Sequence, residues 1–124
     1  MSTRAQIRFA TREEGVSFSE HPEKIHAQFY RHTDGYPEGL GVDIANSLIN
    51  STAVNGRSWE IESLTSRHTD LEYIYYIWQA PGKTTWISIF ERINWSESDP
   101  FECIFVGRPQ KLIDKSKTNT NDEG

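Results

Sequence analysis

Apolar and polar side chains alternate along several short stretches of the chain, the pattern of a β-strand that turns one face toward a core. In the first stretch, Ile7 and Phe9 fall on one face and Gln6 and Arg8 on the other. A later stretch, residues 71–78, carries large apolar side chains on both faces, which predicts a strand in the middle of a sheet. The pattern predicts strands over residues 3–10, 25–32, 71–78, 85–92 and 101–106.

A different spacing, three and four residues apart, predicts helices. Leu40, Ile44 and Leu48 form one apolar stripe of this kind, shortly after Pro37, whose fixed φ suits the first turn of a helix. The predicted helices cover residues 40–49, a short segment around 59–64, and residues 109–114. From residue 115 on, the chain is polar and offers nothing to bury, so we expect a flexible tail.

The predicted order of elements is two strands, two helices, three strands and a final helix. Strands grouped in this way pair mainly as antiparallel hairpins, and the helices then cover one face of the sheet. We therefore expect an α+β fold, with a mostly antiparallel sheet of about five strands and two or three helices packed on one face. The expected organisation is a single domain over residues 1–114 followed by the tail over residues 115–124.

The composition narrows the class of protein. Hydrophobic residues make up 35% of the 124 positions and aromatic residues 12%, which suits a globular domain with large rings in its core. A formal net charge of -5 argues against general binding to nucleic acid or to anionic membranes, because both require a positive surface. No stretch reaches the roughly 18 apolar residues of a membrane span, and no secretory signal is recognisable, so we expect a cytoplasmic protein.

The single cysteine, Cys103, rules out an internal disulfide and a multi-cysteine metal site. It lies in an apolar run, where a buried and unreactive thiol is expected. His32 and Asp34 could supply two ligands of a metal site, but a third and a fourth ligand are not evident. We therefore predict no metal and no cofactor.

The stretch from Tyr30 to Gly41 combines polar side chains with residues that force tight turns, and it joins a predicted strand to a predicted helix. The turn between the strand and the helix is therefore also the candidate site. We refer to residues 30–41 as the corner. The candidate ligand-binding residues in and beside it are Arg4, Arg31, His32, Asp34, Tyr36 and Glu38.

Each candidate in the corner also has a structural interpretation. Asp34 can close a turn and His32 can bond a local carbonyl group. Glu38 can stabilise the positive end of the helix dipole. Arg31 shares a strand face with apolar side chains, so it either forms an internal salt bridge, with Asp34, Asp43 or Glu72 as the partner, or waits for an anionic ligand.

The start Ser2-Thr3-Arg4-Ala5, followed by the corner motif Tyr-Arg-His-x-Asp-Gly-Tyr-Pro-Glu-Gly, resembles a family of small proteins of unassigned activity encoded by tailed bacteriophages and bacteria. The similarity extends to residues 70–73 and 105–109 and so spans about residues 2–113. The resemblance implies a phage context, in which small acidic proteins modulate host or defence machinery and work in the host cytoplasm.

The residues and the resemblance together favour a non-enzymatic, phage-type accessory binding protein. It would engage a host or defence protein, or sequester a small anionic, nucleotide-like ligand, through the corner. The alternative is a small hydrolase that acts on a phosphate or glycosidic substrate, with His32, Asp34 and Glu38 in acid-base roles and Arg4 or Arg31 holding the anion. A third possibility is a self-associating module, since the aromatic residues of the predicted sheet suit either a core or an interface.

Overall fold

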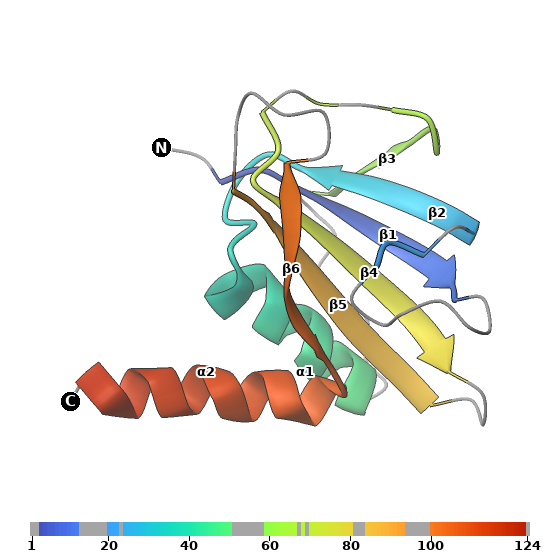
Figure 1. Cartoon of the computed structure of the whole chain (residues 1–124). Coiled ribbons are helices and arrows are strands. Elements are labelled where there is room, and N and C mark those ends of the chain that lie inside the picture. The colour runs from blue at the N-terminus through green and yellow to red at the C-terminus, as the bar shows by residue number, and fades with distance from the viewer. Residues whose placement is uncertain are drawn as a thin grey trace.

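The computed structural model describes residues 3–12, 20–22, 24–50, 59–66, 68, 70–80, 84–93 and 100–123. Six strands and two main helices follow one another along the chain, and a short π-helical turn, η1, leads directly into the first helix (Figure 1). The elements are β1 (Ala5–Thr11), β2 (Lys24–Arg31), η1 (Pro37–Gly41), α1 (Val42–Asn50), β3 (Trp59–Glu62), β4 (Tyr73–Ala80), β5 (Thr84–Arg92), β6 (Phe101–Gly107) and α2 (Pro109–Glu123).

The strands form one sheet in the order β3-β2-β1-β4-β5-β6. All neighbouring pairs are antiparallel except β1 and β4, which are parallel. The chain leaves β2 through η1 and α1 and returns as β3 on the outer side of β2. It then crosses the sheet and continues as β4, which lies beside β1. The α+β class is therefore confirmed, but the expected sheet of about five mostly antiparallel strands is a mixed sheet of six.

The strand that was not predicted is β3, which lies in the segment around residues 59–64 for which a helix was predicted. Trp59 and Ile61 lie opposite Arg31 and Phe29 in an antiparallel pairing with β2. The prediction was wrong because four residues are too few for apolar spacing to separate a strand from a helix. Contact with β2, including the packing of Trp59 on Phe29 at 5.6 Å between ring centroids, decides the outcome.

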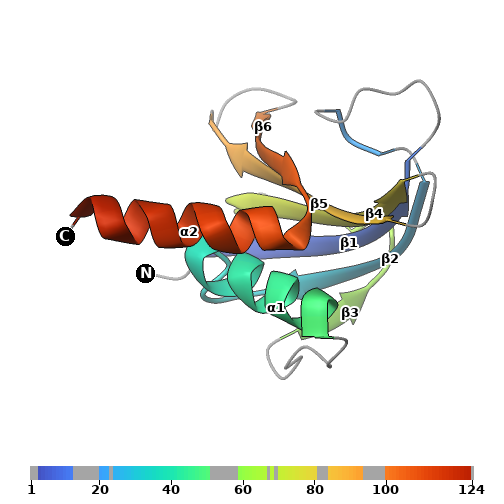
Figure 2. The same ribbon diagram turned by 90° about the horizontal axis from the view of Figure 1, so that it is seen from below.

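Both helices cover the same face of the sheet, as predicted (Figure 2). Leu40 and Ile44 are buried on η1 and α1, and Leu112 is buried on α2. The side chains beneath them come from alternate positions of β1, β4 and β5 and form an apolar core: Ala5, Ile7, Tyr75, Ile77, Ile87 and Ile89. The strand predicted over residues 71–78 corresponds to β4, which contributes large side chains to both faces of the sheet.

The last helix is longer than its pattern indicated. Its predicted end lay at Asp114, whereas α2 continues to Glu123. Leu112 and Ile113 are its buried anchors, and the following residues are too polar to give an apolar periodicity. The flexibility expected from residue 115 on stays a prediction. No helix in the described part of the chain is long and apolar enough to cross a membrane.

Candidate functional site

The face of the sheet that the helices leave uncovered carries buried polar side chains. Gln6, Gln28 and Ser88 are at most 1% exposed, and the guanidinium-bearing Arg8 and Arg12 are 8% and 9% exposed. Large aromatic side chains surround them: Tyr30, Tyr76, Trp78 and Phe90. We refer to the hydrogen-bonded side chains of this face as the polar layer, which consists of Gln6, Arg8, His21, Gln28, Glu62, His68 and Tyr76.

Arg8 lies at the centre of β1, in the middle of the sheet, and is the most unusual member of the polar layer. One terminal nitrogen donates to the Tyr76 hydroxyl at 2.7 Å, and the other donates to Gln6 Oε1 at 2.8 Å. Its Nε is buried and has no hydrogen-bond partner among the residues that the structure describes. Within the described residues no carboxylate forms an ion pair with it. A buried guanidinium normally has such a partner, because the cost of removing its charge from water is otherwise uncompensated.

His21 contacts the Tyr76 hydroxyl, as Arg8 does. Its Nδ1 lies 2.7 Å from the Tyr76 hydroxyl, and its ring stacks on Phe90 with centroids 4.0 Å apart and planes 20° apart. The hydroxyl of Tyr76 therefore lies between a guanidinium and an imidazole. Since the hydroxyl has one proton, it accepts from Arg8 and can donate to His21.

Glu62 forms the second half of the polar layer, on the edge strand β3. Its Oε1 accepts from Gln6 Nε2 at 2.8 Å and Gln28 Nε2 at 2.9 Å, while its Oε2 lies 2.7 Å from His68 Nε2. Burial raises the pKa of the Glu62 carboxyl, but the hydrogen bonds from His68, Gln6 and Gln28 outweigh that effect and hold the pKa below its ordinary value. Glu62 is therefore ionised at neutral pH.

Gln6 joins the two halves, because its amide oxygen accepts from Arg8 and its amide nitrogen donates to Glu62. A continuous chain of hydrogen bonds thus runs from His21 through Tyr76, Arg8, Gln6 and Glu62 to His68. Buried polar chains of this kind are held in one geometry, since breaking any link leaves a group unsatisfied in a poorly hydrated environment. Gln28 Oε1 is one group in the layer that is buried and lacks a donor.

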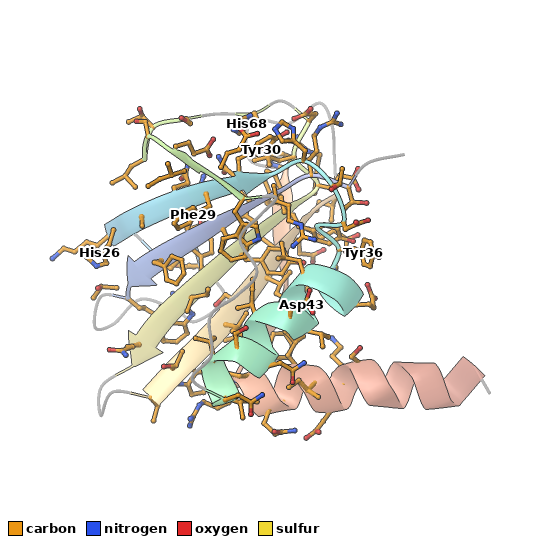
Figure 3. All side chains as sticks on the ribbon, turned by 180° about the vertical axis from the view of Figure 1, so that it is seen from behind. His26, Phe29, Tyr30, Tyr36, Asp43 and His68 are labelled. Carbon is orange, nitrogen blue, oxygen red and sulfur yellow. The ribbon has the colours of Figure 1, made fainter. Side chains whose placement is uncertain are left out.

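Tyr30, at the first position of the corner, contacts two histidines, His32 and His68. Tyr30 and His68 are labelled in Figure 3. The His68 ring stacks on Tyr30 with centroids 3.8 Å apart, and the His32 ring meets it edge-on at 4.5 Å. Burial and the nearby carboxylate of Asp70 raise the pKa of Tyr30, against an opposing effect of Arg4. Tyr30 therefore stays protonated at neutral pH.

The two histidines occupy equivalent places in a short repeat that the pattern of apolar residues does not reveal. The tetrapeptide Arg-His-Thr-Asp occurs at residues 31–34 and again at residues 67–70. His32 and His68 are each hydrogen-bonded through Nε2 to a glutamate of β3, Glu60 and Glu62, at 2.7 Å. The repeat is thus the sequence signal that could have linked His68 to the corner.

The basic candidates of the corner are each engaged with a neighbour. Arg4 forms an ion pair with Asp70 at 3.0 Å, and His32 is paired with Glu60. Arg31 Nε donates to the Thr33 carbonyl oxygen at 2.8 Å, so its recorded partner is a backbone group and none of the three carboxylates considered for it. Whether these residues also bind a ligand stays a prediction.

The remaining candidates lie at the turn and at the start of the helix. Asp34 is exposed and has a φ of 55°, the left-handed conformation that aspartate tolerates in turns. Tyr36 is 40% exposed and sits beside η1, well away from Tyr30 and His68 (Figure 3). Glu38 is exposed in the first turn of η1. No hydrogen bond or ion pair among the described residues joins His32, Asp34 and Glu38.

The turn itself is fixed by the backbone of Gly35. Its N–H donates to the Thr3 carbonyl oxygen at 3.0 Å, and its carbonyl oxygen accepts from the Tyr75 hydroxyl at 2.6 Å. A Cβ on residue 35 would lie 2.7 Å from the Cβ of Ala5, so only glycine fits this close approach. The corner is therefore anchored to β1 and β4 as a structural joint.

Comparison of the chain with protein-family models, curated proteins and solved structures found no match. A search of the described residues for three or more metal-ligating side chains grouped as a metal site also found none. The functional argument therefore rests on the chemistry of the polar layer and of the corner.

None of the residues of the polar layer was among the candidate ligand-binding residues predicted from the sequence, and Arg8 shows why. Arg8 falls on the face of the first strand opposite Ile7 and Phe9, and such alternation ordinarily places a charged residue in water. In the structure, β1 lies between β2 and β4 in the interior of the sheet. That position could not be read from the chain, since it depends on the crossover that brings β4 beside β1.

Proposed function

We propose that the protein is a non-enzymatic binding protein that holds a small anionic ligand, of the phosphate-bearing and nucleotide-like kind, on the uncovered face of its sheet. The ligand would contact Arg8 and the polar layer, and the adjoining part of the corner, Tyr30 and His32, would border the site. This retains the class of ligand expected from the sequence and moves the anion-binding centre from Arg31 to Arg8.

The observation that carries the proposal is the buried and incompletely bonded guanidinium of Arg8. Its charge is removed from water, no carboxylate of the described chain pairs with it, and one N–H lacks an acceptor. A phosphate oxygen would supply both the missing charge and the missing acceptor. With a phosphate oxygen in place, the part of the cost of burying the guanidinium that its two hydrogen bonds leave uncovered would be offset.

Two further features fit a nucleotide-like ligand. The buried Gln28 Oε1 lacks a donor, which an N–H or O–H group of a base or sugar could provide. The His21–Phe90 and His68–Tyr30 stacks surround the layer with flat aromatic faces of the kind on which bases stack. One ligand could thus place its anionic group at Arg8 and its ring near these aromatic faces.

The test is the substitution Arg8→Met, which keeps an unbranched apolar stem and removes the charged guanidinium group. In isothermal titration against a panel of nucleotides, with inorganic phosphate as the reference anion, we expect wild type to bind at least one member and Arg8→Met to bind it at least about tenfold more weakly. The unfolding free energy of the ligand-free protein should change by less than about 1 kcal/mol, because relief of the buried charge offsets the two lost hydrogen bonds.

Arg108→Met is the matched control, since it removes the same charge from an exposed residue on the helix side, where Arg108 Nε donates to the Thr85 carbonyl oxygen. It should leave ligand binding unchanged. The proposal is abandoned if no nucleotide or phosphate binds to wild type. A loss of several kcal/mol of stability in Arg8→Met, with ligand binding intact, would instead assign Arg8 a structural role.

The hydrolase alternative was predicted with His32, Asp34 and Glu38 in acid-base roles. A hydrolase would instead use the His68–Glu62 pair, because a histidine oriented by a carboxylate is suited to proton transfer. The His68 side chain is 25% exposed, so a substrate could reach it. The same titration separates the two functions: a ligand recovered chemically unchanged after incubation supports binding, whereas its conversion supports hydrolysis. Engagement of a host or defence protein remains a prediction from the resemblance described above.

A further inference from the structure

A small apolar pocket lies on the helix side of the sheet, where α2 passes the start of η1. Its walls are formed by Ile89 of β5, Ile104 and Phe105 of β6, and Leu112 of α2, and its volume is about 120 Å³. This is somewhat smaller than an engineered cavity of about 150 Å³ that accommodates benzene. The pocket is therefore suited to an apolar group no larger than benzene, such as a short branched chain.

Two groups of opposite charge border this apolar space, Glu38 of η1 and Lys115 of α2. Both side chains are exposed. In the described part of the chain, neither has a hydrogen bond or ion pair with another side chain. Lys115 Nζ lies 5.7 Å from the centroid of the Phe105 ring, so the ammonium group stands over one of the apolar walls.

We propose that this pocket binds a small apolar α-amino acid or a close chemical relative of one. The apolar side chain would occupy the space between Ile89, Phe105 and Leu112. The ligand carboxylate would pair with Lys115 and its ammonium group with Glu38, because charge complementarity to a zwitterion uses both groups at once. A purely anionic or purely cationic ligand of the same size would satisfy one of them and be repelled by the other.

This site is separate from the polar layer. Ile89, Phe105 and Leu112 belong to the core beneath the helices, whereas Arg8 lies on the opposite face of the sheet. The inference does not depend on the proposed function, and a negative result at one site leaves the other untouched.

The experiment compares three ligands with the same branched apolar group: leucine, 4-methylpentanoate, which lacks the amino group, and isopentylamine, which lacks the carboxylate. Binding is followed by NMR chemical-shift changes and titration with the intact chain. We expect leucine to bind with a dissociation constant in the millimolar range or tighter, and each truncated ligand to bind at least about threefold more weakly. The shifted signals should include those of Leu112 and Phe105.

Charge-neutralising variants identify the two contacts. Lys115→Gln should weaken binding of leucine and of 4-methylpentanoate and leave isopentylamine unaffected or improved; Glu38→Gln should show the reverse pattern for the two truncated ligands. Lys111→Gln, an exposed lysine one turn earlier on α2, and Glu102→Gln, an exposed glutamate on β6, are the matched controls. The proposal is overturned if leucine does not bind, or if Lys111→Gln weakens binding as much as Lys115→Gln does.

Discussion

At the scale of single residues, the polar layer contains a buried cation and a partly buried anion that are not in direct contact. Arg8 and Glu62 are joined through Gln6, whose amide accepts from the cation and donates to the anion. An amide is suited to this place because it offers a donor and an acceptor at fixed separation. Both carboxylate oxygens of Glu62 accept hydrogen bonds, from Gln6, Gln28 and His68, whereas the buried Nε–H of Arg8 has no acceptor among the described residues. That asymmetry is why the ligand is expected at Arg8.

Glu62→Gln tests the contribution of the carboxylate to stability. We expect a loss of about 1–3 kcal/mol in the free energy of unfolding at neutral pH, because charge-assisted hydrogen bonds are replaced by weaker neutral ones. The folded-state pKa of Glu62 is depressed, so its stabilising effect is complete above its ordinary value of 4.5 and is lost as the pH falls through the folded value. The difference between wild type and variant in urea unfolding should therefore vanish in acid.

Glu60→Gln serves as the comparison for Glu62→Gln. Glu60 is the neighbouring glutamate of β3 and also bonds a histidine, but its side chain is 63% exposed. Its replacement should cost at most about 0.5 kcal/mol. Equal effects of the two substitutions would show that burial of Glu62 is not the source of its stabilisation.

Tyr75→Phe tests the attachment of the corner to the sheet. Tyr75 is completely buried, and burial raises the pKa of its hydroxyl well above the ordinary value, so the group remains a donor to the Gly35 carbonyl oxygen. Removing it leaves a buried carbonyl group without this partner, and we expect a loss of about 1–2 kcal/mol in chemical denaturation. Tyr73→Phe, a half-buried tyrosine on the same face of β4, should change stability by less than about 0.5 kcal/mol.

At the scale of elements, α2 closes the core although most of its length is polar. Leu112 is 4% exposed and approaches η1, where a Cβ added to Gly41 would lie 3.4 Å from the Leu112 side chain. Leu112→Ala should cost about 2–4 kcal/mol in thermal or denaturant unfolding, since it leaves a cavity beneath the helix. Lys111→Ala, at an exposed position of the same helix, should be nearly neutral; a comparable loss there would mean that helix propensity and not packing holds α2 in place.

The two elements that the sequence described least well, β3 and α2, share a physical cause. Trp59 to Glu62 is a strand only because β2 offers it a partner, and the same four residues would suit one turn of a helix. The second half of α2 has no apolar side chains from which a period could be read. Elements with longer apolar patterns, such as β4 and α1, were predicted within a few residues of their observed ends.

At the scale of the whole molecule, one sheet separates two interiors of different chemistry. Both helices lie on one side of the sheet in Figure 2, and the interior beneath them is apolar and matches the pattern of alternate positions in the strands. The opposite face combines aromatic rings with a connected set of polar side chains from β1, β2, β3 and β4. A connected and buried polar network holds its members in one geometry, and this is the face on which we propose that the ligand binds.

The sequence by itself determined the α+β class, most of the strands, the first helix and the tight turn at residues 34–35. These features depend on neighbours along the chain: alternation, the three-to-four spacing, and the conformations that aspartate, glycine and proline allow. It also led to a set of candidate ligand-binding residues at and beside the corner, His32 among them, and their role in binding stays a prediction.

Only the tertiary structure decided that β4 lies parallel to β1, that β3 is a strand, and that Arg8 is buried. Each outcome depends on contacts between segments far apart in the chain, such as Arg8 with Tyr76 and Gln6 with Glu62. Local pattern states which face of a strand a residue occupies, but burial of that face is set by the elements packed against it. For Arg8 this difference turns an apparently solvated arginine into the centre of the proposed binding site.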